Sequence, residues 1–311
     1  MHPIASQPLR IRTRIGQARG RARHAAAYTG RMTLHTLAAA DAVALQWREW
    51  PCAPARGTVL VVHGLGEHIG RYQMLAARLN AWGWRVAGHD QRGHGSSGGA
   101  RGDLPRADAM LDDLSRVIDA VRIPSGGPLL LLGHSLGGLI ASRFVAEGLA
   151  AQPAPWWRKV DALVLSSPAL DPGMNGAKKL LLAVLGRLAP HLAVNNGLKP
   201  AWLSRDASVV RAYIDDPLVH DRVTPALVRC IVDAGEQVRR LAPAWNARTL
   251  LLYAGSDRCV APAGSAAFAA AAPANVTARE FPSLFHEIFN EPERDEVFAA
   301  LQSWLDALTA A

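Results

Sequence analysis

Residues 129–138 read LLLLGHSLGG, four leucines followed by a serine that has glycine two positions before it and two positions after it. The leucines are typical of a buried strand in a parallel sheet. Glycine at these offsets permits a sharp turn from a strand into a helix, because side chains there would collide with neighbouring backbone. Ser135 at the tip of this turn is therefore the candidate nucleophile. The alternative is an ordinary strand–helix turn in which the serine has no role.

The sequence on both sides of this turn continues the same pattern from about residue 58 onward. Short apolar runs alternate with longer helical segments, which predicts a mostly parallel central sheet with helices on both faces. Glycine-containing polar turns follow the first strands, so we expect the chemistry at the carboxyl edge of the sheet. The predicted strands are residues 58–62, 85–88, 129–132, 162–165, 249–253 and 276–281.

The alternation breaks between residues 171 and 247, where prolines interrupt irregular helices. We interpret this segment as an inserted helical cap. The core is then expected to comprise residues 41–170 and 248–311.

A serine needs a base, and the base needs an orienting group. Where a serine nucleophile follows a strand of such a parallel sheet, the acid and then the histidine come later in the chain. His191 and His220 fall in the predicted cap, so His286, which follows the last predicted strand, is the candidate base.

The candidate acid also follows a strand. Asp257 comes just after residues 249–253, and we favour it as the group that orients the histidine. Asp171 follows an earlier strand and stays the alternative.

Hydrolysis through a serine also requires backbone N–H donors for the developing oxyanion. Leu136 directly follows the nucleophile and should supply one donor. The loop HGLGEH after the first predicted strand should supply the second from Leu65, with His63 and Glu67 supporting the loop.

The composition, 50% hydrophobic and 19% charged, is that of a globular protein with a sizeable core. The net charge of +8 is concentrated at the start of the chain, because seven arginines precede Asp41 and only 27 basic residues then face 26 acidic ones. The rest of the chain is nearly neutral and lacks a groove-reading motif, so we expect no nucleic-acid partner. The seven arginines are Arg10, Arg12, Arg14, Arg19, Arg21, Arg23 and Arg31.

Residues 1–40 are expected to form an arginine-rich disordered tail or an upstream read-through before Met32; a targeting or anionic-surface role is the alternative. No apolar run is long enough to predict a membrane span, so we expect a soluble cytoplasmic protein with peripheral membrane contact at most. Cys52, Cys230 and Cys259 lack paired spacing, which favours reduced thiols over disulfides or a metal site.

Four stretches resemble the monoacylglycerol lipase and lysophospholipase family of α/β-hydrolases. They are HGLGEHIGRY at 63–72, DQRGHGSS at 90–97, GHSLGG at 133–138 and HEI at 286–288, and the resemblance spans most of residues 45–308. It implies the α/β-hydrolase fold, a small-molecule ester or lipid as substrate, and no metal or organic cofactor. In one departure, a single residue, Ser256, separates Gly255 from Asp257 where many relatives have two.

The resemblance implies hydrolysis of carboxylic esters, with a monoacylglycerol or lysophospholipid as the expected substrate. A general short-chain carboxylesterase, an acyltransferase, an amide- or thioester-cleaving enzyme and a non-catalytic ligand-binding relative are the alternatives. The apolar stretch KKLLLAVL at 178–185 predicts either a helix packed on the core or a lipid-facing lid.

Overall fold

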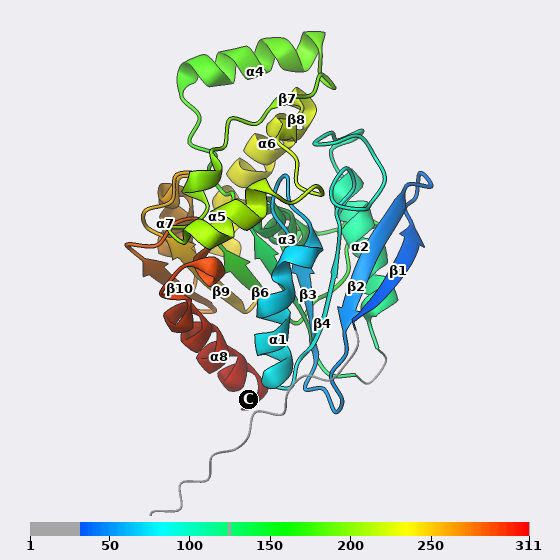
Figure 1. The fold of residues 1–311 in the computed structure, drawn as a ribbon, viewed down its shortest axis with the longest axis vertical. Coiled ribbons are helices and arrows are strands. Elements are labelled where there is room, and N and C mark those ends of the chain that lie inside the picture. The colour runs from blue at the N-terminus through cyan, green and yellow to red at the C-terminus, as the bar shows by residue number, and fades with distance from the viewer. Residues whose placement is uncertain (1–31, 124–125, 311) are drawn as a thin grey trace, which may run out of the picture.

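The computed structural model describes residues 32–123 and 126–310. These residues form an eight-stranded sheet whose strands lie in the order β1-β2-β4-β3-β5-β6-β9-β10 (Figure 1). β2 runs antiparallel to β1 and β4, and all other neighbours are parallel. The strands are β1 Thr33–Ala38, β2 Ala44–Trp50, β3 Thr58–Val62, β4 Arg85–His89, β5 Leu129–His134, β6 Ala162–Ser166, β9 Thr249–Ala254 and β10 Val276–Phe281.

Helices cover both faces of this sheet, and each face has its own apolar core (Figure 1). Alternate residues of β5 point to opposite sides: Leu129 and Leu131 belong to one core cluster, Leu130 and Leu132 to the other. This two-sided burial explains the uninterrupted leucine run. The first cluster includes side chains of α2 Ala109–Val121, α3 Leu136–Ala146, α6 Pro225–Leu241 and α7 Pro262–Ala271; the second includes those of α1 Gln73–Ala81 and α8 Arg294–Ala310.

The six predicted strands are confirmed, each to within two residues of its observed end. β1 and β2 were not predicted. β1 occupies Thr33–Ala38, inside the segment 1–40 assigned to a disordered tail, so that assignment is wrong for these six residues. β1 is an edge strand with half-buried and exposed side chains, so it lacks the apolar run by which buried strands are recognised. The predicted tail over residues 1–31 lies outside the described residues.

The segment between β6 and β9 holds α4 Gly176–Leu188, α5 Ala207–Ile214 and α6, together with a small ribbon of β7 Val194–Asn195 and β8 Arg222–Val223. α6 packs against α3 and contributes Leu227 and Val238 to the main core. α4, in contrast, forms the top of the molecule in Figure 1 and has no buried residue.

The three cysteines are free thiols, as predicted. Among the helices of the described residues, none combines the length and the apolar character that crossing a membrane would require.

Candidate active site

Ser135 lies between β5 and α3 with a backbone φ of 53°, in the left-handed region that side chains rarely adopt. The turn is held by Ser135 N–H, which donates to the carbonyl of Ser166 at 3.0 Å. A Cβ on Gly137 would lie 2.1 Å from the carbonyl oxygen of Val62, so the turn requires glycine there. The strained turn presents the serine hydroxyl at the carboxyl edge of the sheet.

The structure brings the three side chains predicted to act together into one hydrogen-bonded row. Ser135 Oγ lies 2.8 Å from His286 Nε2, and His286 Nδ1 lies 2.6 Å from Asp257 Oδ2. His286 follows β10 and Asp257 follows β9, so the row depends on neighbouring parallel strands that end at the same edge. With the proton on Nδ1, the unprotonated Nε2 faces the serine hydroxyl.

Charges around the imidazole favour its protonated form. Burial alone would lower the pKa of His286, but the Asp257 carboxylate beside it, followed by Glu287 and Glu67, raises that pKa above its ordinary value. Burial would raise the pKa of Asp257, but His286 and the N–H groups of Val260 and Cys259 lower it. The pair is therefore poised to accept a proton on Nε2 while the carboxylate stays ionised.

Asp171, the alternative acid, is engaged elsewhere. Its Oδ1 accepts from Gly173 N–H at 2.8 Å, and its Oδ2 lies 3.7 Å from Arg239. The loop before Asp257 is tied to the segment after β10, because Ser256 N–H donates to the carbonyl of Leu284. With the single residue Ser256 between Gly255 and Asp257, the Asp257 carboxylate still reaches His286.

Leu65 and Leu136, the predicted oxyanion donors, both line the cavity onto which Ser135 opens. Within residues 32–123 and 126–310, neither backbone N–H donates to a protein acceptor. His63 is fixed beneath this loop: its Nδ1 lies 2.8 Å from the carbonyl of Gly64, and its Nε2 accepts from Gln91 N–H. Both N–H groups therefore lack a protein acceptor among these residues, as the predicted role requires, and their role as oxyanion donors stays a prediction.

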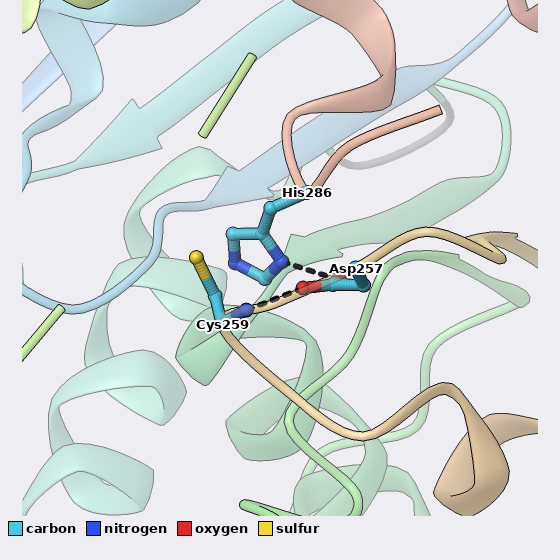
Figure 2. A group of neighbouring side chains, drawn as sticks. All are labelled: Asp257, Cys259 and His286. Atoms are coloured by element: carbon cyan, nitrogen blue, oxygen red, sulfur yellow. Dashed lines mark hydrogen bonds and ion pairs between the residues drawn. The ribbon is translucent and has the colours of Figure 1, made fainter. Parts of the chain in front are cut away.

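Cys259 lies close enough to Asp257 and His286 for the three to be potential metal ligands, with ligand atoms within 4.8 Å of one another (Figure 2). Both carboxylate oxygens of Asp257 already accept hydrogen bonds, however. Burial also raises the pKa of the Cys259 thiol, which disfavours the thiolate that a metal binds. The chemistry of Asp257, Cys259 and His286 therefore fits a hydrogen-bonded histidine–aspartate pair better than a metal site.

The cavity above Ser135 has a volume of about 700 Å³ and runs under the segment between β6 and β9. Apolar side chains form most of its wall, and Arg258 and Lys178 add positive charge. Its apolar residues include Leu65, Leu136, Leu181, Leu182, Leu185, Leu198, Trp202, Val228 and Ile231.

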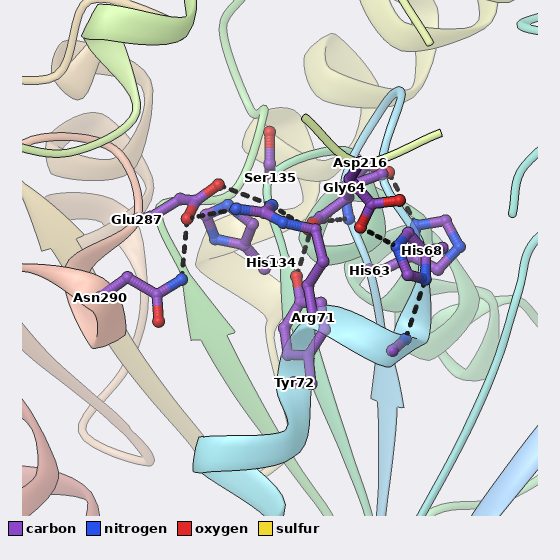
Figure 3. A network of polar contacts seen from close by, with 12 residues as sticks. His63, Gly64, His68, Arg71, Tyr72, His134, Ser135, Asp216, Glu287 and Asn290 are labelled. Carbon is purple, nitrogen blue, oxygen red and sulfur yellow. Dashed lines mark hydrogen bonds and ion pairs between the residues drawn. The ribbon is translucent and has the colours of Figure 1, made fainter. Parts of the chain in front are cut away.

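A buried ionic network that was not predicted lies behind the serine (Figure 3). Arg71 lies between the carboxylates of Glu67 and Glu287, and Tyr72 donates to Glu67 at 2.6 Å. Arg71, Tyr72 and Glu287 all fall in stretches that carry the family resemblance, but nothing in those stretches indicates that the three side chains belong to one network.

The parallel sheet, the serine turn and the row of three side chains define an α/β-hydrolase. A family model described as serine aminopeptidase, S33, matches residues 53–293. The chain belongs to this family.

Similar proteins agree with this assignment. The monoacylglycerol lipase of Mycolicibacterium smegmatis is 35% identical over 87% of this chain and 96% of its own length. The crystal structure of Paleococcus ferrophilus monoacylglycerol lipase is 36% identical, covers 85% of this chain and 99% of its own, and superposes with a TM-score of 0.75. An abhydrolase domain-containing protein of Dictyostelium discoideum is 30% identical over 88% of this chain, which spans 29% of that longer protein. Together these findings make the chain a carboxylic ester hydrolase.

Proposed function

We propose that the chain hydrolyses single-chain glycerol esters, monoacylglycerols above all, through an acyl-enzyme formed on Ser135. The observation that carries the proposal is the hydrogen-bonded row of Ser135, His286 and Asp257 beside an apolar cavity. The proposed reaction needs no metal or organic cofactor.

In the first half-reaction, Ser135 Oγ attacks the ester carbonyl carbon while His286 Nε2 takes the hydroxyl proton. Asp257 holds the ring in the required tautomer and stabilises the imidazolium that forms. The N–H groups of Leu65 and Leu136 donate to the carbonyl oxygen as it becomes negative. The bond to the alcohol then breaks, and Nε2 gives its proton to the leaving oxygen.

In the second half-reaction, water replaces the alcohol. His286 Nε2 removes a proton from the water, whose oxygen attacks the acyl carbon of the Ser135 ester. Collapse of the second tetrahedral intermediate returns the proton to Ser135 Oγ and releases the fatty acid.

The cavity supports a substrate with one long acyl chain. Its volume of about 700 Å³ and its apolar wall suit an alkyl chain that reaches the serine from under α4. Two similar proteins are named monoacylglycerol lipases, which supports the same substrate class.

We propose further that residues 171–247 act as a cap and that α4 makes transient contact with the lipid surface that presents the substrate. Leu180 and Leu188 are 68% and 79% exposed, although leucine is normally buried. Lys178, Lys179 and Arg187 on the same helix would favour an anionic lipid surface. This contact would place the protein at the periphery of a membrane.

The test is a panel of glycerol and p-nitrophenyl esters of graded acyl length, with lysophospholipid and amide analogues, run on the wild type and on Ser135→Ala. We expect a preference for long single-chain glycerol esters, and a loss of turnover of several orders of magnitude in the variant. Activity limited to short acyl groups would indicate a general esterase instead. Wild-type turnover in Ser135→Ala would exclude the mechanism.

A further inference from the structure

Arg71 joins two loops that are far apart in sequence. Its Nη1 donates to Glu67 Oε2 at 2.6 Å and to Glu287 Oε1 at 2.8 Å, and its Nη2 donates to Glu287 Oε2 at 2.9 Å (Figure 3). Glu67 and Glu287 are 4% and 5% exposed, so both carboxylates depend on this guanidinium in place of water.

Each carboxylate is also attached to a loop that carries a proposed catalytic group. Glu67 Oε1 accepts from Gly64 N–H at 2.6 Å, and Gly64 directly precedes Leu65. Glu287 directly follows His286, and its backbone N–H donates to the carbonyl of Leu203. The guanidinium therefore connects the loop of the proposed oxyanion donor to the loop of the proposed base.

We propose that Arg71 is a positioning residue that fixes the Leu65 N–H and the His286 ring relative to each other through Glu67 and Glu287. This inference rests on the proposed function, since it assigns no contact between Arg71 and the reacting atoms. A displacement of about 1 Å between catalytic groups can reduce turnover about 10²-fold, so a rigid link between two loops has a measurable effect on rate.

The bridge also sets the charge near the base. One guanidinium faces two carboxylates, so the network has a net negative charge beside His286. Arg71 lowers the pKa of Glu67 to about 2 against the effect of burial, which keeps that carboxylate ionised. The titratable and charged groups facing His286 are Asp257, Cys259, His134, Glu67 and Glu287.

A buried ion pair could instead serve stability alone. Arg92 offers a comparison, because it bridges Asp113 and Asp41 with distances of 2.6 to 3.3 Å and its side chain is 4% exposed. Neither of these carboxylates lies in a loop with a proposed catalytic residue. Lysine at either position keeps the charge but loses the planar, forked set of donors.

The experiment compares Arg71→Lys, Arg92→Lys and Glu287→Gln in the full chain, with p-nitrophenyl butyrate as substrate and a fluorophosphonate as probe of Ser135 reactivity. We expect Arg71→Lys to lose kcat and labelling rate by about 10²-fold with little change in KM. Arg92→Lys should lose thermal stability but keep kcat within about twofold. If the kcat of Arg71→Lys is less than about tenfold below the kcat of Arg92→Lys, the proposal is overturned.

Glu287→Gln decides the matter if Arg71→Lys does not fold. It removes a negative charge beside His286, so the acid limb of the kcat/KM profile should move to lower pH. The variant also removes the ion pair between Arg71 and Glu287, so we expect kcat and the labelling rate to fall at least about tenfold with little change in KM. Unchanged kcat and labelling rate in Glu287→Gln would overturn the proposal. Ser135→Ala separates the two levels of failure: if it keeps wild-type turnover, the proposed function fails; if it is inactive and Arg71→Lys is unimpaired, only the role of Arg71 fails.

Discussion

His286 Nε2 and Ser135 Oγ lie 2.8 Å apart, although 151 positions separate the two residues in the chain. The contact depends on the turn after β5 and the loop after β10, which meet at one edge of the sheet. The proposed reaction therefore depends on how these two loops are held relative to each other.

Replacing Asp257 by asparagine should leave the fold intact but reduce kcat about 10⁴-fold, because the amide favours the wrong tautomer of His286. The measurement is steady-state hydrolysis of p-nitrophenyl butyrate. Asp171→Asn is the matched control and should keep kcat within about threefold, since the Asp171 carboxylate bonds Gly173 and not the histidine. The reverse ranking would make Asp171 the acid.

The pH dependence of kcat/KM should show an acid limb above the ordinary histidine pKa of about 6.5. Asp257 overcomes the effect of burial and raises the pKa of His286, so the ring keeps its proton at higher pH than a free histidine. Activity is therefore full above the raised pKa and is lost as the pH falls through it. Release of fatty acid is followed by titration, which does not depend on nitrophenol ionisation. A flat profile down to pH values well below that of free histidine would contradict the proposed base.

Most of the fold could be predicted because five of the six predicted strands, β3, β4, β5, β6 and β9, are short and are buried along their whole length. β1 could not, because an edge strand with alternating exposed side chains has no run of buried residues. β2 pairs with β4, and β1 pairs with the free edge of β2. This pairing depends on the assembled sheet and not on a local sequence pattern.

The positions of the candidate site residues were predictable to the extent that each belongs to a local turn after a strand. Glycine stands two positions before and two positions after Ser135, and Asp257 and His286 each follow a predicted strand. The Arg71–Glu287 pair was not predictable, because 216 positions separate the partners and either residue alone resembles an ordinary surface charge.

Gly66→Ala should impair catalysis by displacing the loop that contains Leu65. Gly66 has a φ of +77°, and a Cβ there would lie 2.3 Å from the carbonyl oxygen of His220. A left-handed alanine costs about 1 to 2 kcal/mol of folding free energy, and loss of one oxyanion donor lowers kcat about 10²- to 10³-fold.

Gly83→Ala is the control for this change. It carries the same left-handed cost at φ +85°, but the nearest atom is the flexible Arg56 side chain at 3.3 Å. Both variants are compared by thermal unfolding and by kcat. Equal kcat values for the two variants would show that catalysis does not depend on the position of the loop that contains Leu65.

The double variant Leu180→Glu, Leu188→Glu should lower activity on monoacylglycerol presented in vesicles and leave hydrolysis of dissolved p-nitrophenyl butyrate unchanged. Both side chains are largely exposed on α4 and neither lines the cavity, so the serine and its pocket stay intact. A leucine fully buried in lipid contributes about 1.5 to 3 kcal/mol, so loss of two should weaken vesicle binding at least tenfold.

The matched control is Leu34→Glu, which places the same charge on an exposed leucine of the edge strand β1, away from α4 (Figure 1). Co-sedimentation with phosphatidylglycerol vesicles measures binding directly. If the α4 variant and the β1 variant bind and hydrolyse vesicle substrate equally well, the exposed leucines of α4 do not contact lipid, and the long acyl chain must reach the cavity by another approach.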